Sequence, residues 1–356
     1  MEAALRALAG DEDVAALFSD AAALRACVEA EAALVRAQGA AGAAPVAEAD
    51  EIARAIEGFR PDPARIAQGF ARDGVPIPAL VADLKASLGP SRGRRVHVGA
   101  TSQDIVDTAL TLRLRKVAEI VAARLRAVDD ALAALAARDG ATPLMAHTRM
   151  RRALPFTAAD RIAGWRRPLA LHLARLEEIA PRAFVVQLGG PVGAPAKGGA
   201  VGDAVRAEFA RLLGLGDAPP WQDARDRVGE FAGWLALVCG TLGKFGQDVA
   251  LMAQDEIGVA RPARGGGSSS MPHKVNPVEA ETLVALARWA SALAGAVGQA
   301  MVHENERSGA AWTLEWLALP PLCEAAAASG RLAARLASSL SLRPDAAAAA
   351  AKEGTA

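Results

Sequence analysis

A glycine- and serine-rich segment that leads into a helix start is the clearest candidate for chemistry. It reads GGGSSSMPHKVNP over residues 265–277, so a flexible loop precedes a helix capped by Asn276, with Pro277 at the first helical position. A helix N-terminus attracts anions, and Lys274 adds a positive charge beside it. We interpret the segment as a lid that closes over a carboxylate substrate. The alternative is a solvated linker, which composition alone favours.

A second polar cluster, TSQDIVDT (101–108), also stands at an expected helix start. Its first three residues, Thr101, Ser102 and Gln103, can donate hydrogen bonds to an anionic ligand. The alternative is simple capping by Thr101 or Ser102, since both residue types are common caps.

Two further segments carry arginines that can bind anions. In HTRMRRALP (147–155), Arg149 and its two neighbouring arginines can bind carboxylates bidentately, or can form an ordinary exposed run of charge. Arg307, in HENERSGAAWTLEW (303–316), is another candidate anion ligand. The sequence therefore holds several separate candidates for recognising a carboxylate.

Composition excludes several classes of protein. The 356 residues contain 40 basic and 40 acidic side chains and no Tyr, which gives no electrostatic case for nucleic acid or an anionic membrane as partner. Cys27, Cys239 and Cys323 form no metal-binding or disulfide pattern, so we expect buried thiols. We see no signal peptide and no uncharged apolar run of the ~18 residues that span a membrane, so we expect a cytoplasmic protein.

Three long helices are expected to position these groups. They cover residues 104–138, 223–257 and 276–303, and their apolar residues alternate at spacings of four and three. Helices of this length pack side by side, and their surplus apolar seams suggest oligomerisation. A shorter helix is expected over 157–180, broken at Pro168 and ended by Pro181.

The predicted organisation is all-α. Residues 1–100 hold shorter helices and are interpreted as a small helical N-terminal domain. Residues 101–343 form the central bundle domain, and residues 344–356 form a frayed tail, because they lack a hydrophobic face.

Three segments together resemble the fumarase/aspartase superfamily over about residues 10–340. GSSSMPHKVNP (267–277) is similar to its signature GSSxMPxKxNP, TSQDIVDT to its first conserved region, and LGGPVG (188–193) to its usual LGGAVG. Within the superfamily, residues 97–110 and 303–316 are similar to the group of 3-carboxy-cis,cis-muconate cycloisomerases.

The resemblance implies an all-α homotetramer whose active sites are shared between subunits, with no metal or organic cofactor. It implies interconversion of 3-carboxy-cis,cis-muconate and its carboxymuconolactone through an aci-carboxylate intermediate, in protocatechuate catabolism. By position, Ser268 would move the proton, and Lys274 and Asn276 would hold the substrate carboxylate. Lys274 would also tune the serine. Many relatives carry a further C-terminal helical domain, and we expect this chain to lack it.

One departure from the superfamily bears on the reaction. Many members carry GRTHxQxAxP, and alignment on Pro155 places Arg149 at the histidine of that motif and His147 at its arginine. The acid that would protonate a departing amine is therefore missing, which favours an internal cyclisation. Arg149 can instead bind the added carboxylate of a tricarboxylate substrate.

Two alternatives remain. One is a lyase that eliminates an amine from a fumarate-yielding substrate, as adenylosuccinate lyase does. The other is an inactive helical structural protein, against which the presence of Ser268, Lys274 and Asn276 argues.

Overall fold

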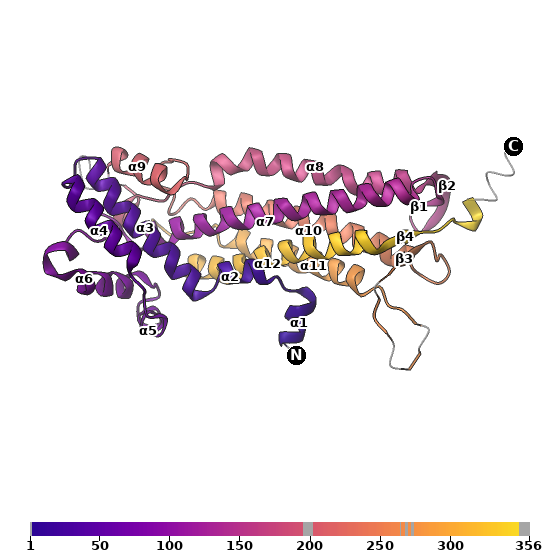
Figure 1. The fold of residues 1–356 in the computed structure, drawn as a ribbon, viewed down its shortest axis with the longest axis horizontal. Coiled ribbons are helices and arrows are strands. Elements are labelled where there is room, and N and C mark those ends of the chain that lie inside the picture. Colours follow the sequence, from indigo (N-terminus) through magenta and orange to yellow (C-terminus); the bar gives the residue numbers. More distant parts are fainter. Residues whose placement is uncertain (1, 195–201, 264, 268–269, 272–273, 349–356) are drawn as a thin grey trace.

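The computed structural model describes residues 2–194, 202–263, 265–267, 270–271 and 274–348. The described chain is elongated and almost entirely helical, with long helices running side by side along its length (Figure 1). The predicted all-α, long-helix fold is confirmed. The described part of the bundle consists of α7 (Ser102–Asp139), α8 (Ala158–Ala183), α10 (Asp226–Met252), α11 (Val278–Gln299) and α12 (Gly309–Ser339).

The predicted apolar seams form the core of the bundle. In α7 every seam residue is buried, namely Leu114, Ala118, Val121, Leu125, Val128, Leu132 and Leu135. The seam of α10 is buried as well: Val228, Phe231, Leu235, Val238, Leu242, Phe245, Val249 and Met252. The three cysteines are also buried and unpaired, as expected.

Helix α8 is longer than predicted. It continues through both Pro168 and Pro181, although each proline removes a backbone hydrogen bond. Pro168 follows Gly164 by four residues, and Gly164 is exposed, so water can satisfy the carbonyl that loses its donor. The apolar face of α8 packs in the bundle core through side chains that include Trp165 and Leu169, and this burial outweighs the local cost of the prolines.

Two helix starts differ from the prediction. Helix α10 begins at Asp226, with Arg225 rather than Asp223 in the capping position. Helix α11 is preceded by Pro277 in the capping position, because Asn276 pairs its backbone with Gly266 in an isolated antiparallel bridge. Helix α12 was not foreseen, since Pro320 and Pro321 lie inside it.

The shorter helices pack against the bundle, most of them at the end where α7 begins (Figure 1). They are α1 (Glu2–Ala9), α2 (Glu12–Leu17), α3 (Asp20–Ala40), α4 (Val46–Gly58), α5 (Pro63–Asp73), α6 (Ile77–Gly93) and α9 (Asp203–Leu213). Helices α3 to α6 and α9 share a second apolar cluster with the first turns of α7, including Ile105 and Ala109. This cluster crosses the predicted boundary at residues 100 and 101, and the division into domains stays a prediction.

Two small antiparallel sheets lie at the opposite end, where α7 finishes (Figure 1). Strands β1 (Pro143–Thr148) and β2 (Arg151–Thr157) form a hairpin that the sequence reasoning missed, and its turn holds Arg149 at a φ of 48°. Strand β3 (Ala260–Pro262) pairs with β4 (Leu340–Leu342), and the Leu342 N–H donates to Asp139 at the end of α7 (2.8 Å).

Helices α10 and α11 are long and apolar enough to cross a membrane by length and composition. In the fold they belong to the bundle, where 50% and 39% of their most apolar windows are buried. Their apolar character therefore has an explanation in helix packing.

Candidate active site

The start of α7 brings together four of the residues singled out in the sequence. Thr101 occupies the capping position and Ser102 opens the helix. The Arg307 guanidinium, from the loop before α12, donates to the hydroxyl of Thr101 (3.3 Å) and to the side-chain oxygen of Gln103 (2.8 Å). The guanidinium of Arg307 is thus held beside the N-terminus of α7. Its positive charge and the free N–H groups of the helix both favour binding of an anion there.

Gln103 has a different place from the one expected of a substrate ligand. Its side chain is fully buried, and its amide nitrogen donates to Asp107 (3.1 Å) and to the carbonyl of Gln222 (2.7 Å). Its oxygen accepts from Arg307. Because all three contacts lie inside the protein, Gln103 positions the arginine instead of facing solvent.

Asp104 anchors the glycine-rich segment 188–193 beside this arginine. It accepts hydrogen bonds from the N–H groups of Gly189 (2.8 Å) and Gly190 (3.0 Å) and from the side chain of Gln187 (3.1 Å). Burial raises the pKa of Asp104 to about 6, and these donors act in the opposite direction. Because this segment is held against α7, the carbonyl of Pro191 accepts a third bond from Arg307 (3.3 Å).

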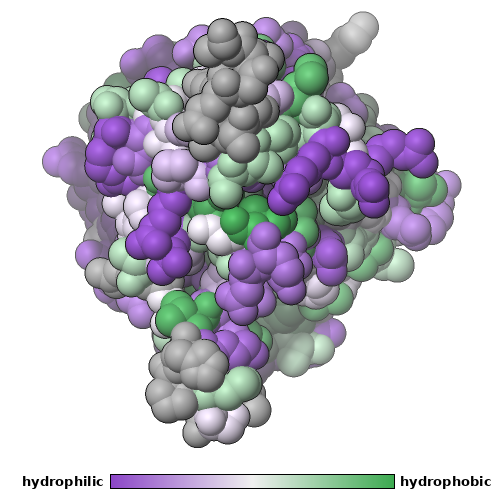
Figure 2. Space-filling view, turned by 90° about the vertical axis from the view of Figure 1, so that its right-hand side faces the viewer, coloured by the Kyte–Doolittle hydropathy of each residue, from purple (hydrophilic) through white to green (hydrophobic). Residues whose placement is uncertain are grey.

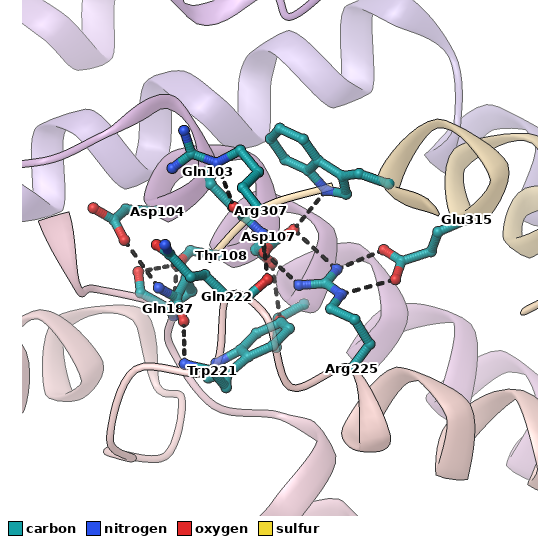
Figure 3. Close-up of polar contacts among 12 residues, drawn as sticks. Gln103, Asp104, Asp107, Thr108, Gln187, Trp221, Gln222, Arg225, Arg307 and Glu315 are labelled. Carbon is teal, nitrogen blue, oxygen red and sulfur yellow. Dashed lines mark hydrogen bonds and ion pairs between the residues drawn. The ribbon is translucent and has the colours of Figure 1, made fainter. Parts of the chain in front are cut away.

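A buried ion cluster lies directly beneath these residues (Figure 3). Arg225, in the capping position of α10, donates to Asp107 of α7 (2.6 and 3.2 Å) and to Glu315 of α12 (2.6 and 2.9 Å). All three side chains are at most 1% exposed. The ring of Trp221 lies 4.8 Å from the guanidinium, and Trp312 donates to Asp107 (3.2 Å).

This cluster joins three bundle helices at one point and ends at the candidate site. Burial raises the pKa of Glu315, while Arg225 lowers it. Asp107 accepts from both Arg225 and Gln103, so a continuous chain of contacts leads from α12 to Arg307 (Figure 3). Sequence reasoning missed the cluster, because its members are isolated charges on helical stretches far apart in the chain.

His303 lies near the same cluster and is not the surface histidine that the sequence allowed. Its Nδ1 accepts from the N–H of Ser308 (3.4 Å), and its Nε2 is buried without a partner among the described residues. Burial, together with the charge of Arg225, lowers the pKa of His303. The imidazole is therefore neutral at neutral pH.

The other sequence-derived residues lie at the far end of α7. Arg149 is in the β1–β2 turn, and Lys274 and Asn276 are in the segment between β3 and α11. Lys274 is exposed, and its backbone N–H donates to the carbonyl of Met271 (3.0 Å). Ser268 lies outside the described residues.

A cavity of about 360 Å³ adjoins the hairpin at this end. Arg149 and His147 line it together with Lys244, Asp248 and Arg161. Figure 2 faces this end of the molecule and shows apolar side chains at its centre with hydrophilic side chains around them. The cavity also has apolar lining that includes Met145, Phe156 and Leu251, so Arg149 adds its charge beside hydrocarbon surface, which suits a ligand that has both a carboxylate and a hydrocarbon part.

The two groups of residues are separated by the length of α7. This helix has 38 residues, which corresponds to roughly 57 Å at 1.5 Å per residue. One copy of the chain therefore does not bring Arg307 and Lys274 to the same small-molecule site.

We expect Arg225→Met to destabilise the fold by about 3–5 kcal/mol, because it leaves Asp107 and Glu315 buried without a cation. The loss of stability should be smaller at acidic pH, because burial raises the pKa of Glu315 and its protonation removes one of the two unpaired charges. Arg166→Met is the matched control, since its bidentate pair with Asp129 is only half-buried and is worth about 1 kcal/mol or less. Urea unfolding at fixed protein concentration measures both, and equal losses would contradict the role of the cluster.

The chain is similar in sequence to a cycloisomerase and to a lyase. It is 40% identical over 315 residues to 3-carboxy-cis,cis-muconate cycloisomerase of Pseudomonas aeruginosa, which covers 86% of this chain and 69% of that protein. It is 35% identical over 315 residues to N-acetyl-S-(2-succino)cysteine lyase of Enterococcus italicus, which covers 87% and 69%.

The fold is similar to that of a solved relative. The crystal structure of 3-carboxy-cis,cis-muconate lactonizing enzyme from Pseudomonas putida superposes with a TM-score of 0.87, at 35% identity, over 97% of this chain and 78% of that one. A lyase family model matches residues 12–290, which include both the start of α7 and the segment 265–277. The chain therefore belongs to this lyase family, the fumarase/aspartase superfamily that its motifs resemble.

Proposed function

We propose that the chain is a cycloisomerase that interconverts 3-carboxy-cis,cis-muconate and its carboxymuconolactone, in protocatechuate catabolism. The observation that carries the proposal is the fixed guanidinium of Arg307 over the N-terminus of α7, in a chain 40% identical to a cycloisomerase of this name. Such a site suits a small carboxylate and the negative charge that develops on it during reaction.

The reaction is an internal addition. One carboxylate oxygen of the substrate bonds to an alkene carbon, and the electron pair of the double bond moves toward the neighbouring carboxylate. The resulting aci-carboxylate carries extra negative charge, which N–H donors and cations stabilise. Ser268 then protonates the carbon, with Lys274 and the local N–H groups tuning the hydroxyl. No leaving group is released in this reaction, so it needs no acid to protonate one. This agrees with Arg149 at the position where many superfamily members have the histidine proposed as that acid.

We propose further that the working form is a cytoplasmic homotetramer with shared sites. Support comes from the separation of Arg307 and Lys274 along α7, which packing of several copies can close. A groove of about 940 Å³ between α8, α10 and α11 also offers a surface for a helix of a second copy, with Leu237 53% exposed in it. Trp289 of α11, which is 52% exposed, lines a separate cavity beside α1. Closed symmetric assemblies of this kind bury such apolar surface.

The first prediction concerns turnover. Purified protein should remove the ultraviolet absorbance of the conjugated diene in 3-carboxy-cis,cis-muconate, because ring closure destroys the conjugation. Ser268→Ala should lower kcat by on the order of 10²-fold or more, as expected when the group that transfers the proton is lost. Turnover of adenylosuccinate or another amine-releasing substrate without any loss of the diene would favour the lyase alternative. No turnover with any of these acids would favour a structural protein.

The second prediction concerns substrate class. Arg149→Ala should raise KM for the tricarboxylate about tenfold and leave kcat nearly unchanged, because a bound carboxylate would lose a charge-assisted partner. Arg167→Ala, which removes an exposed arginine from the neighbouring helix α8, is the control. Kinetics indistinguishable from wild type would remove Arg149 from the substrate site.

Shared active sites should allow two inactive variants to restore activity to each other. Arg307→Met and Ser268→Ala should each be inactive alone. The two variants are then dissociated, mixed in equal amounts and allowed to reassemble. If each site takes Arg307 and Ser268 from different copies, random assembly gives an intact pair at one site in four. The mixture should therefore recover roughly a quarter of wild-type activity.

A second mixture controls this experiment. Ser268→Ala mixed with Lys274→Met should recover nothing, since both residues belong to one segment of one chain. Native mass spectrometry should first confirm that mixed oligomers form. Mixed oligomers of Arg307→Met and Ser268→Ala that stay inactive would refute sharing of the site.

A further inference from the structure

A second cavity lies between the N-terminal helices and the bundle, away from the residues discussed so far. It has a volume of about 230 Å³ and is lined by residues of α7, α12 and the segments around α2, α3 and α5. A neighbouring cavity of about 340 Å³ shares Ala23, Phe70 and Pro76 with it. Arg113 lines the first cavity from a point about 15 Å along α7 from Gln103, at 1.5 Å per residue.

Arg113 forms no ion pair among the described residues. Its Nε donates to the carbonyl of Ala109 (3.1 Å), which is the residue one turn earlier, and its guanidinium lies 5.3 Å from the ring of Phe18. Neither contact supplies a negative charge. Desolvation lowers the pKa of Arg113, but a guanidinium stays charged in proteins, so the cation is half-buried and uncompensated.

The other polar groups around the cavity do not provide the missing charge. Glu315 lines it, but both of its oxygens accept from Arg225. Burial raises the pKa of Cys27 to about 12, so this neighbouring thiol is neutral at neutral pH. Asp20 lines only the adjoining cavity and is exposed.

The rest of the wall is apolar and largely aromatic. Phe70 and Trp316 lie 5.9 Å apart between ring centroids, and Phe18 faces the cavity from the end of α2. Leu110 and Leu319 complete the apolar lining. Such a wall suits the flat face of a ring and gives no partner to additional polar groups.

We propose that this cavity is a binding site for a small aromatic monocarboxylate, with the carboxylate on Arg113 and the ring against the wall that Phe70 and Trp316 form together. A planar carboxylate matches the paired donors of a guanidinium, so the ligand supplies the charge that the protein lacks. The volume is sufficient, because a cavity of about 150 Å³ lined by apolar side chains accommodates benzene. Among the described residues, Arg113 is the one cation in the lining, which limits the ligand to one carboxylate in the pocket.

Benzoate is the probe for this site, measured by isothermal titration calorimetry on the intact protein. It should bind saturably, with one molecule per chain. Benzamide has the same shape without the charge and should bind wild type roughly ten- to a hundredfold more weakly. Arg113→Met should lose affinity by a similar factor. Circular dichroism should show that this variant stays folded, since it removes a cation that has no counter-charge.

Three controls separate this site from the proposed active site and from general charge effects. Lys116→Met removes an exposed cation from the same helix and should leave benzoate affinity unchanged. Arg307→Met should also leave it unchanged, whereas binding at the turnover site would be lost. Arg113→Lys keeps the charge and should retain part of the affinity.

Three outcomes would overturn the proposal. The first is that wild type does not bind benzoate saturably. The second is that wild type binds benzoate and benzamide equally well. The third is that Arg307→Met loses benzoate binding while Arg113→Met keeps it. The comparison of the two ligands needs only wild type, so it decides the matter even if Arg113→Met fails to fold. None of these outcomes depends on whether the chain acts on a muconate.

Discussion

The buried guanidinium of Arg225 is the contact on which the candidate site depends. It holds one carboxylate from α7 and one from α12 while it begins α10, so three long helices meet at a single cation. In the interior such a group is stable only if its hydrogen bonds are satisfied, and here Asp107 and Glu315 accept four of them. A lateral shift of any of the three helices would break this arrangement, which gives the helix ends a defined register.

The same cluster explains how an exposed arginine is held in place. Asp107 accepts from Gln103, and Gln103 accepts from Arg307, so the orientation of the outer cation is set by groups that water does not reach. Asp104 adds a second constraint by holding the glycine-rich segment whose carbonyl contacts Arg307. Preorganisation of this kind stabilises developing charge better than flexible side chains do, because the donors need not reorient during reaction.

The length of the helices has a consequence for function. A helix of 38 residues separates its two ends by much more than the size of a small substrate, so groups at opposite ends act together only across different copies of the chain. We therefore regard assembly as part of the proposed chemistry. The exposed Leu237 on α10 and Trp289 on α11 are consistent with this view.

The sequence by itself determined the helical fold and the segments that mark the family. Apolar spacings of four and three predicted α7 and α10 closely, because a helix buries one face whatever it packs against. Helix α12 and the continuity of α8 past Pro168 could not be predicted, since they depend on packing that outweighs the local effect of proline. Arg307, Thr101 and Ser102 were recognised and do lie together.

Only the tertiary structure decided how those residues are used. It turned Gln103 inward, joined Arg225 to two distant carboxylates and, among the described residues, left Arg113 without one. It also set the start of α7 and the segment around Lys274 at opposite ends of the molecule. The physical reason is that spacing along a chain sets which face of a helix a residue occupies, whereas the partner of a polar group depends on which helices pack there.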